Sequence, residues 1–476
     1  MLNEVLNLYS NINDLQNTAI IDLSTPEEKH YSFQEIENLV INLTRFLLDQ
    51  DINPGSKVGI IGVNSIKFVV AYFAIRRAGC VAVPINYKLP KEQVEYICKD
   101  SDTTFIFADS EFLNLCPSNI ASVELSLLSG NGTITDQPAT RPAVILYTSG
   151  STGNPKGVVI HHDKRQWWLK QTCRYIPDNV ALLSAPLYHQ NGLSNIETGL
   201  SCGYCTVLMP LFETKQYASA IERYKVTILL AVPAMLAMVL KEPNISTDFS
   251  SVKFVNLGSA PTSEKLFQDI QSNFKNARVI LRYGSTETGA SLFGFHPKLP
   301  TPPMSVGYPR PGVECKIVDG VLFVKHNGML TSYYKNNSLY SNAVTADGFY
   351  NTKDLFRVDE NGFYFFVGRT DDMFKSGGNT IFPVEVQTAL DRHPSVNESF
   401  VLGVEDDIKG TKPYAFVVLN DDTSEATLIK FVAQHLAPYQ IPRRIWFLDK
   451  LPLTNINKVD KKTLSELAKA NIAKDI

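Results

Sequence analysis

Hydrophobic and polar positions in the first third of the chain follow two alternating periods. Residues 32–49 carry apolar side chains at helical spacing, and Ser32 with Glu35 forms a possible capping box, so we predict a helix there. Short apolar runs predict strands at 58–62, 81–85 and 104–108, with helices at 65–77 and 91–99 between them. Strands that alternate with helices favour a parallel, doubly wound α/β sheet.

The alternation resumes after a weakly patterned polar stretch, residues 116–142, which we interpret as a loop. Strands are predicted at 181–185, 206–209, 227–232, 254–257 and 279–282, with helices at 216–224 and 262–274. Six prolines between residues 296 and 312 mark a change of architecture. The alternating runs 314–318 and 321–325 that follow predict an antiparallel β-subdomain.

A last unit begins near Asp371. It is predicted to hold helices at 384–391 and 425–436, strands at 399–404 and 414–419, and a polar tail. The pattern therefore predicts a large N-terminal α/β domain, residues 1–370, and a small α+β C-terminal domain, residues 371–476. A chain of 476 residues is also too long for one compact core.

Composition excludes several classes of protein. The chain is 44% hydrophobic and 20% charged with a net charge of −3, which gives no electrostatic case for nucleic acid or anionic membrane as a partner. The start lacks a basic region, so no signal peptide is predicted. The longest apolar stretch, 226–240, contains Pro233 and is too short to span a bilayer. Seven scattered cysteines predict reduced thiols and a cytoplasmic setting.

Candidate chemistry is densest between Leu146 and Gly157. The segment Thr148-Ser149-Gly150-Ser151-Thr152-Gly153 is followed by Lys156, so turning backbone, hydroxyl donors and one mobile charge lie together. These are the components of a phosphate cradle. On composition alone, a flexible Gly/Ser surface turn would be the commoner case. The Walker pattern is excluded, because no Lys-Ser or Lys-Thr pair ends the segment and an apolar run, 158–160, follows it.

The order of residues in this segment resembles the phosphate-binding signature of the adenylate-forming superfamily, which includes acyl- and aryl-CoA synthetases, luciferases and peptide-synthetase adenylation domains. The resemblance extends from about Ser32 to Leu464, with five or six motifs in the family's order. It implies ATP, Mg²⁺ and coenzyme A as cofactor and co-substrates. It also implies a small C-terminal domain that moves about a hinge near Asp371.

The second signature of that superfamily matches Tyr283 to Gly289. By resemblance, Tyr283 stacks on adenine next to Gly284, Thr286 contacts the adenylate phosphate, and Glu287 helps hold Mg²⁺. A carboxylate is a hard oxygen ligand that suits magnesium. A solvated Gly-bounded turn would be the ordinary interpretation of such a segment taken alone.

Two further segments resemble parts of the adenine and acyl pocket. Gly258, Ser259, Ala260 and Pro261 match the loop along that pocket, although the same residues could simply form a strand-to-helix turn capped by Thr262. His189, within Pro186–Gly192, is expected to be a gate or wall of the acyl pocket. No acid lies between Pro186 and Gly192, which disfavours an amino-acid substrate because amino-acid-adenylating relatives carry an aspartate there.

The remaining motifs lie toward the C-terminus. The resemblance assigns Asp354 to the ribose hydroxyls and Arg369 to ribose or phosphate. The family usually has glycine where this chain has Lys353, and a lysine there would be strained if the position needs a positive φ.

Two motifs would serve the small domain's part of the reaction. The glycines of Lys375–Asn379, Gly377 and Gly378, are implied to line the pantetheine tunnel. Lys458 is implied to be the catalytic lysine of the adenylation step. It follows Asn457 where the family usually has glycine, and asparagine tolerates left-handed backbone best among the other residues.

These assignments imply a two-step ligase. A carboxylate attacks the α-phosphate of ATP to give an acyl-adenylate and pyrophosphate, with Lys156, Thr286, Glu287 and Lys458 as the catalytic set. The thiol of coenzyme A then attacks the adenylate carbonyl. Two alternatives stay open: a ligase that loads an acyl carrier protein, and a non-catalytic relative that binds nucleotide or acyl ligand. A fatty and an aryl acid are equally compatible with the sequence, which does not predict the oligomeric state.

Overall fold

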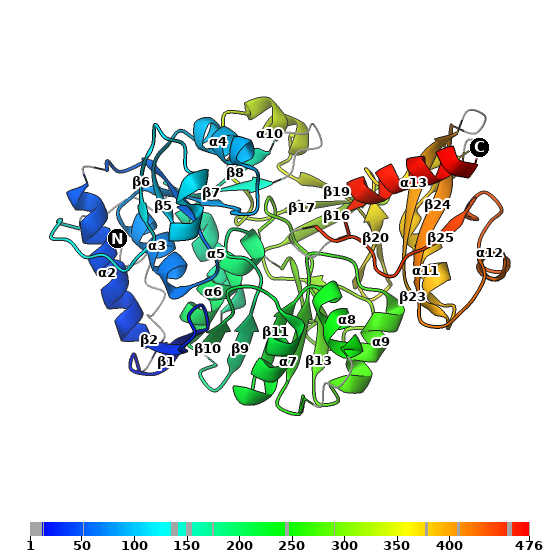
Figure 1. Ribbon diagram of the computed structural model, residues 1–476, viewed down its shortest axis with the longest axis horizontal. Coiled ribbons are helices and arrows are strands. Elements are labelled where there is room, and N and C mark those ends of the chain that lie inside the picture. The colour runs from blue at the N-terminus through cyan, green and yellow to red at the C-terminus, as the bar shows by residue number, and fades with distance from the viewer. Residues whose placement is uncertain are drawn as a thin grey trace.

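The computed structural model describes residues 12, 14–50, 52–134, 141–148, 155–173, 176–242, 247–289, 291–376, 379–406, 410–454 and 459–475. Two seven-stranded sheets and a four-stranded antiparallel sheet form the larger part of the molecule, and a smaller α+β unit lies at one end of its long axis (Figure 1). The predicted fold class, a large α/β part followed by a small α+β part, is confirmed.

Six strands of the first large sheet lie within residues 57–161, and the seventh comes from later in the chain. Its strand order is β18 (Ser332–Tyr333), β8 (Lys156–His161), β7 (Pro142–Thr148), β4 (Val81–Ile85), β3 (Lys57–Ile61), β5 (Thr103–Ala108) and β6 (Ala121–Glu124). The strands from β7 to β6 are parallel, whereas β8 runs antiparallel to both β7 and β18. Its connecting elements are α2 (Phe33–Asp49), α3 (Ile66–Arg77), α4 (Lys91–Asp100), the 3₁₀ helix η1 (Ser110–Leu115) and α5 (His162–Thr172).

The second large sheet has the order β13 (Arg278–Leu281), β12 (Phe254–Leu257), β11 (Ile228–Ala231), β9 (Val180–Leu183), β10 (Cys205–Leu208), β1 (Thr18–Asp22) and β2 (Lys29–Ser32). All of its pairs are parallel except β1–β2. Its helices are α6 (Gln190–Cys202), α7 (Thr214–Arg223), α8 (Pro233–Lys241) and α9 (Glu264–Asn273). Helix α5 contacts β8, α6 contacts β9 and β10, and the two helices contact each other, so they join the two sheets.

The antiparallel sheet follows the proline-rich segment, as predicted. Its order is β16 (Glu314–Val318), β17 (Val321–Lys325), β19 (Tyr350–Val358) and β20 (Tyr364–Arg369). A short pair, β14 (Phe293–Gly294) with β15 (Tyr308–Pro309), and α10 (Asn337–Ala343) complete this part. The predicted strands 314–318 and 321–325 agree with β16 and β17 residue for residue.

The C-terminal unit has hydrophobic clusters of its own. It comprises β21 (Phe374–Ser376), β22 (Asn379–Ile381), α11 (Pro383–Asp391), β23 (Val396–Asp406), β24 (Gly410–Leu419), α12 (Glu425–Val432), β25 (Ile445–Phe447) and α13 (Lys461–Asp475). It meets the large part at α9, where Lys265 Nζ donates to the Val396 carbonyl (2.7 Å) and Arg392 pairs with Glu264 (3.5 Å).

Local signals explain why α2 forms where the sequence predicts it. Ser32 caps the helix and accepts from the Glu35 N–H, and the Glu35 carboxylate accepts from the Ser32 N–H, which is the predicted capping box. The predicted apolar face is buried, namely Phe33, Ile36, Val40, Leu43 and Leu47. Burial of such side chains stabilises the fold by about 1.5–3 kcal/mol each.

Three details of the sequence interpretation are wrong. Residues 116–142 are not only loop, because β6 adds a strand to the sheet edge beside β5. The cap of α9 is Ser263, which accepts from the Leu266 N–H, and not Thr262. The polar tail is the 15-residue helix α13; its buried Leu464 and Ala468 pack into the last hydrophobic cluster.

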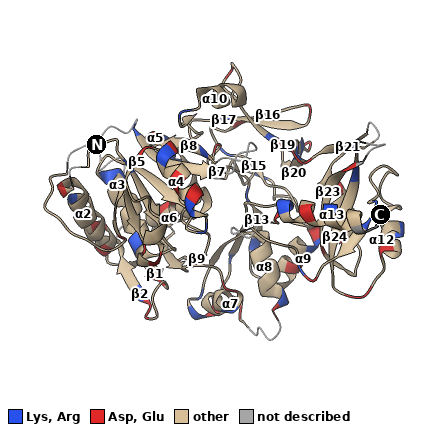
Figure 2. Ribbon diagram, turned by 45° about the horizontal axis from the view of Figure 1, so that its top comes forward, with Lys and Arg blue, Asp and Glu red and all other residues tan. Residues whose placement is uncertain are grey.

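The surface agrees with the modest net charge. Figure 2 shows Lys and Arg interspersed with Asp and Glu on the helices of both parts of the molecule. Among the helices that the structure describes, none combines the length and the apolar character needed to cross a bilayer.

Candidate functional site

A cavity of about 1790 Å³ lies at the carboxyl ends of β9, β11, β12 and β13. In open parallel sheets the carboxyl ends of the strands are where ligands bind. Its walls come from α6, from the turns after β12 and β13, from β19 and β20, and from α11 of the C-terminal unit. Both parts of the molecule therefore line the same space.

Lys156 and Glu287, which lie 131 positions apart in the sequence, meet at one end of this cavity. Lys156 opens β8 directly opposite Thr148, the last residue of β7, in the antiparallel pair. Its Nζ lies 3.6 Å from Glu287 Oε1. The hydroxyl of Thr148 is buried and has no hydrogen-bond partner in the described chain, so it is available to a ligand. Thr286 also lines the cavity here.

Two tyrosines that the sequence did not identify lie beside Glu287, and one of them, Tyr333, is hydrogen-bonded to its carboxylate. Tyr333 donates to Glu287 Oε1 (3.2 Å), its hydroxyl lies 3.2 Å from that of Tyr350, and its ring lies 4.8 Å from Lys156 Nζ. Burial and the neighbouring Glu287 raise the pKa of both tyrosines, so they stay protonated and can donate. Tyr333 lies on β18, next to β8, and a sequence motif would not show that neighbourhood.

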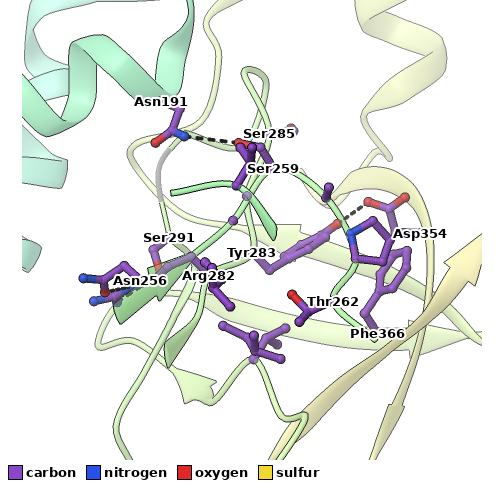
Figure 3. A pocket seen from close by; sticks show the side chains of 18 of the residues that line it. Asn191, Asn256, Ser259, Thr262, Arg282, Tyr283, Ser285, Ser291, Asp354 and Phe366 are labelled. Carbon is purple, nitrogen blue, oxygen red and sulfur yellow. Dashed lines mark hydrogen bonds between the residues drawn. The ribbon is translucent and has the colours of Figure 1, made fainter. Parts of the chain in front are cut away.

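A second polar cluster joins Tyr283, Asp354 and Arg369. Tyr283 donates its hydroxyl proton to Asp354 Oδ2 (2.6 Å), as Figure 3 shows. Arg369 Nε lies 2.8 Å from Asp354 Oδ1, close enough for an ion pair but not aligned as a hydrogen bond. Burial raises the pKa of Asp354, and Arg369 and the Tyr283 hydroxyl offset only part of that effect. The structure thus brings three predicted nucleoside residues to one place.

The loop after β12 is held close to the start of α6. Gly258, Ser259, Ala260 and Pro261 all line the cavity. Ser259 has a φ of +68°, and its hydroxyl accepts a hydrogen bond from Asn191 Nδ2 (3.3 Å), which Figure 3 shows. Because a non-glycine residue seldom adopts such a φ, this loop is held in a specific shape. Gly284, which follows Tyr283, also faces the cavity.

His189 is the residue before α6, and it lines the cavity as predicted. Its ring packs edge-on against Tyr188 with centroids 4.7 Å apart. A Cβ at Gly192 would lie 2.3 Å from the Pro186 carbonyl oxygen, so only glycine fits where α6 passes the turn. This close contact explains the Gly192 of the predicted pocket segment.

Lys353 occupies the strained position that the sequence analysis considered. Its φ is +59°, and its carbonyl accepts from the Thr370 N–H (2.8 Å). Its Nζ lies 3.4 Å from both carboxylate oxygens of Asp371. Asp372 in turn accepts a hydrogen bond from Lys461 of α13 (2.5 Å). The residues around the predicted hinge are therefore connected to both parts of the molecule.

Some predicted site residues lie outside the described residues. These are Ser149, Gly150, Ser151, Thr152, Gly153, Gly377, Gly378 and Lys458. The residues that flank them, Thr148 with Lys156 and Ser376 with Asn379, are described and lie at the ends of paired strands.

Comparison with family models gives two matches in order along the chain. A model described as "AMP-binding enzyme" matches residues 13–334, and one described as "AMP-binding enzyme C-terminal domain" matches residues 385–458. The first match includes Lys156, Glu287 and Tyr333, which meet at one end of the cavity. The second covers most of the C-terminal unit.

Individual proteins match over nearly their whole length. A 2-succinylbenzoate–CoA ligase of Bacillus cereus (strain AH820) is 27% identical over 461 residues, which are 93% of this chain and 94% of that protein. A fatty acid–[acyl-carrier-protein] ligase, ScoC, of Streptomyces coeruleorubidus is 27% identical over 479 residues, with 92% of both chains covered. The o-succinylbenzoate coenzyme A synthetase (MenE) of Bacillus subtilis, solved in complex with ATP and a magnesium ion, superposes with a TM-score of 0.83 at 27% identity and covers 98% of each chain.

Proposed function

The chain belongs to the family of AMP-binding enzymes, and we propose on that premise that it is an AMP-forming acid–thiol ligase. A carboxylic acid and ATP give an acyl-adenylate and pyrophosphate, and the thiol of coenzyme A then converts the adenylate into a thioester and AMP. An aryl acid fits the ligases that the chain resembles. The observation that supports this function most strongly is the single cavity that joins Lys156 and Glu287 to Tyr283, Asp354 and Arg369.

The Lys156–Glu287 end suits the phosphates of ATP. Magnesium in nucleotide sites takes one or two protein carboxylates and completes its shell with phosphate oxygens and water. Glu287, which lines this end of the cavity, would supply such a carboxylate. Bound there, Mg²⁺ would neutralise charge on the phosphates. Lys156 adds a cation, and the hydroxyls of Thr148 and Thr286 add donors.

The other cluster suits the nucleoside. Asp354 would accept from the ribose hydroxyls, with Arg369 beside it. Tyr283 would offer its ring to adenine next to Gly284 and the loop from Gly258 to Pro261. The Tyr283 hydroxyl is already used by Asp354, and this bond fixes the plane of the ring before nucleotide arrives.

A carboxylate is already a nucleophile, so the chemistry needs alignment and charge stabilisation more than a general base. His189 and the start of α6 would form one side of the acid's entrance. Lys458 is proposed to reach the α-phosphate in the adenylation step.

The thioester step is proposed to use a second arrangement of the C-terminal unit. We propose residues 1–370 and 371–476 as the two domains, with rotation near Asp371. That motion would withdraw Lys458 and bring Gly377 and Gly378 to the pantetheine path. It must break the Lys353–Asp371 pair, an exposed contact that costs little to open.

A second acceptor is a specific alternative. The likeness to a ligase that acts on an acyl carrier protein favours testing a carrier thiol beside coenzyme A. We also propose a cytoplasmic setting, because all seven cysteines are free in the described chain.

The experiment separates the two half-reactions. Purified protein is given ATP, magnesium and a panel of carboxylates, and pyrophosphate release is measured; the best acid is then offered coenzyme A or a holo-carrier protein. Lys458→Ala should nearly abolish adenylate formation but leave thioester formation from supplied acyl-adenylate. Equal loss in both half-reactions would refute the role of Lys458, and no pyrophosphate release with any acid would refute the enzyme itself.

A further inference from the structure

The cavity runs along one face of the second sheet, and the polarity of its lining changes along that face. The strand register places two residues from each of three neighbouring strands on that face, and all six line the cavity. They are Ile228 and Leu230 of β11, Phe254 and Asn256 of β12, Ile280 of β13, and Arg282, which directly follows β13. Four of these six lining residues, Ile228, Leu230, Phe254 and Ile280, are apolar. The other two, Asn256 and Arg282, lie toward the carboxyl ends of the strands, where a ligand binds.

Arg282 is half-buried and lines the cavity. Its Nε donates to Asn256 Oδ1 (2.9 Å) and one terminal nitrogen donates to Ser291 Oγ (3.4 Å), as Figure 3 shows. Both partners are neutral. None of the ion pairs formed within the described part of the chain includes Arg282.

The surroundings of Arg282 include a second positive charge, that of Arg310. Burial and the nearby Arg310 lower the pKa of Arg282 to about 9, and Tyr204 offsets only part of this shift. The guanidinium is still charged at neutral pH. A half-buried charge without a counter-ion is unfavourable, so its place in the wall of the cavity needs a reason.

The part of the cavity wall that α6 forms is polar as well. Asn191, Ser194, Asn195 and Thr198 follow one another at helical spacing along α6, and all four line the cavity. Asn195 donates to the side-chain oxygen of Asn191 (2.7 Å). A long alkyl chain would gain little from such a wall, whereas an acid with further polar groups would form hydrogen bonds with it.

We propose that Arg282 is a specificity-determining residue that selects acids carrying a second anionic group. One carboxylate of the substrate is adenylated, and the second anionic group meets the guanidinium beside Asn256 and Ser291. The planar guanidinium suits a carboxylate or a sulfonate, because two parallel N–H donors can reach two oxygens. This inference rests on the proposed ligase function and names its substrate class.

Matched pairs of acids test the proposal on the unaltered enzyme. Pyrophosphate release is measured with succinate against butanoate, glutarate against pentanoate, and isophthalate against benzoate. In the pair of the size that the enzyme accepts, the diacid should have a kcat/KM at least about tenfold higher, as expected for a charged hydrogen bond. Succinamate, which replaces the second carboxylate by a neutral amide, should fall between the diacid and the monoacid. Replacing succinate by 3-sulfopropanoate separates a carboxylate from a sulfonate site.

A variant then assigns the preference to the arginine. Arg282→Met should reduce the diacid-to-monoacid ratio by about tenfold or more, while the matched control Arg223→Met, an exposed arginine of α7, should leave the ratio unchanged. If Arg282→Met does not fold, as judged by its melting curve, the unaltered enzyme still tests the proposed substrate class, because equal or better use of monoacids would overturn it.

Each outcome has a distinct meaning. A preference for diacids that Arg282→Met abolishes supports the proposal. Equal or better use of monoacids by the unaltered enzyme, or a preference that Arg282→Met does not change, overturns the proposal and leaves the ligase function intact. If none of the acids tested causes release of pyrophosphate, the ligase function is overturned, and the proposal fails with it.

Discussion

Two buried arginines, Arg76 and Arg165, and the half-buried Arg282 have opposite surroundings. Arg76 and Arg165 share the carboxylate of Glu197, whereas Arg282 has only neutral partners and faces the cavity. The two buried arginines therefore have a carboxylate as counter-ion, to which Tyr72 also donates a hydrogen bond (2.9 Å). The contrast indicates which charge serves the fold and which one is available to a ligand.

The Glu197 cluster joins three helices between the large sheets. Arg76 lies on α3, Arg165 on α5 and Glu197 on α6, and their side chains are about 3–4% exposed. Burial alone would raise the pKa of Glu197, but Arg165 and Arg76 lower it overall, so the carboxylate is ionised. Since α6 also forms a cavity wall, this cluster fixes the position of that wall.

The largest expected effect comes from breaking this cluster. Glu197→Ala leaves two buried arginines without a carboxylate and should lower the free energy of unfolding by about 3–5 kcal/mol. Urea denaturation at neutral pH measures the loss. Arg282→Met, which removes a charge that has no counter-ion, should stay within about 1 kcal/mol of the unaltered protein.

The control for Glu197→Ala is Glu28→Ala. Glu28 pairs with Arg223 at the surface, so its loss should cost much less stability than the loss of Glu197. If Glu197→Ala proved no more harmful than Glu28→Ala, or if Arg282→Met destabilised the protein as much as Glu197→Ala, the contrast between the Glu197 cluster and Arg282 would be wrong.

Asp391 extends the comparison to an acid that is largely buried but does not line the cavity, so its charge is not available to a ligand there. Burial raises its pKa to about 7, and the hydroxyl of Ser399, which donates to it (2.7 Å), offsets part of that shift. An unfolded aspartate loses its proton near pH 4. Between about pH 4 and 7 the folded chain therefore binds more protons than the unfolded chain, and stability falls as the pH rises.

Asp391→Asn should remove this pH dependence. At pH 8 the variant should be more stable than the unaltered protein by about 1–2 kcal/mol, less than the full shift implies because the carboxyl keeps some exposure, and at pH 4 the difference should vanish. Urea denaturation across this pH range measures it. A variant that is less stable than the unaltered protein at pH 8 would show that the buried carboxylate is compensated in the folded state.

Lys353 should give the smallest effect. Its φ of +59° is unfavourable for a lysine by about 1 kcal/mol. In its ion pair with Asp371, both side chains are exposed to solvent, so the pair stabilises the fold little. Lys353→Gly relieves the backbone but loosens the unfolded chain, so stability should rise by no more than about 1 kcal/mol and ATP–pyrophosphate exchange should stay within about threefold. A larger loss of exchange would place Lys353 in the reaction.

The fold was largely predictable because local signals agree with it. The capping box and apolar spacing of α2 depend on neighbours in sequence, and so do the alternating runs of β16 and β17. The helix α13 was missed because few of its residues are apolar; Leu464 and Ala468 are buried only where the C-terminal unit folds over them.

The site was predictable only in part, for a related physical reason. Motifs named Lys156, Glu287 and Asp354, since each lies in a recognisable local sequence. The contribution of Tyr333 depends on β18 pairing with β8, and the neutral surroundings of the Arg282 guanidinium depend on Asn256 of β12 and on Ser291 lying next to it in the fold. Such facts concern tertiary neighbours, and no stretch of sequence records them.

The central claim is that Lys156 and Glu287 hold the phosphates of ATP during adenylation, and carboxylate-dependent ATP–pyrophosphate exchange tests it most directly. The unaltered protein should exchange in the presence of an accepted acid, and Glu287→Gln, similar in shape but neutral, should lower the rate by about 10²–10³-fold without loss of folding. Exchange at the full rate by Glu287→Gln would contradict the account.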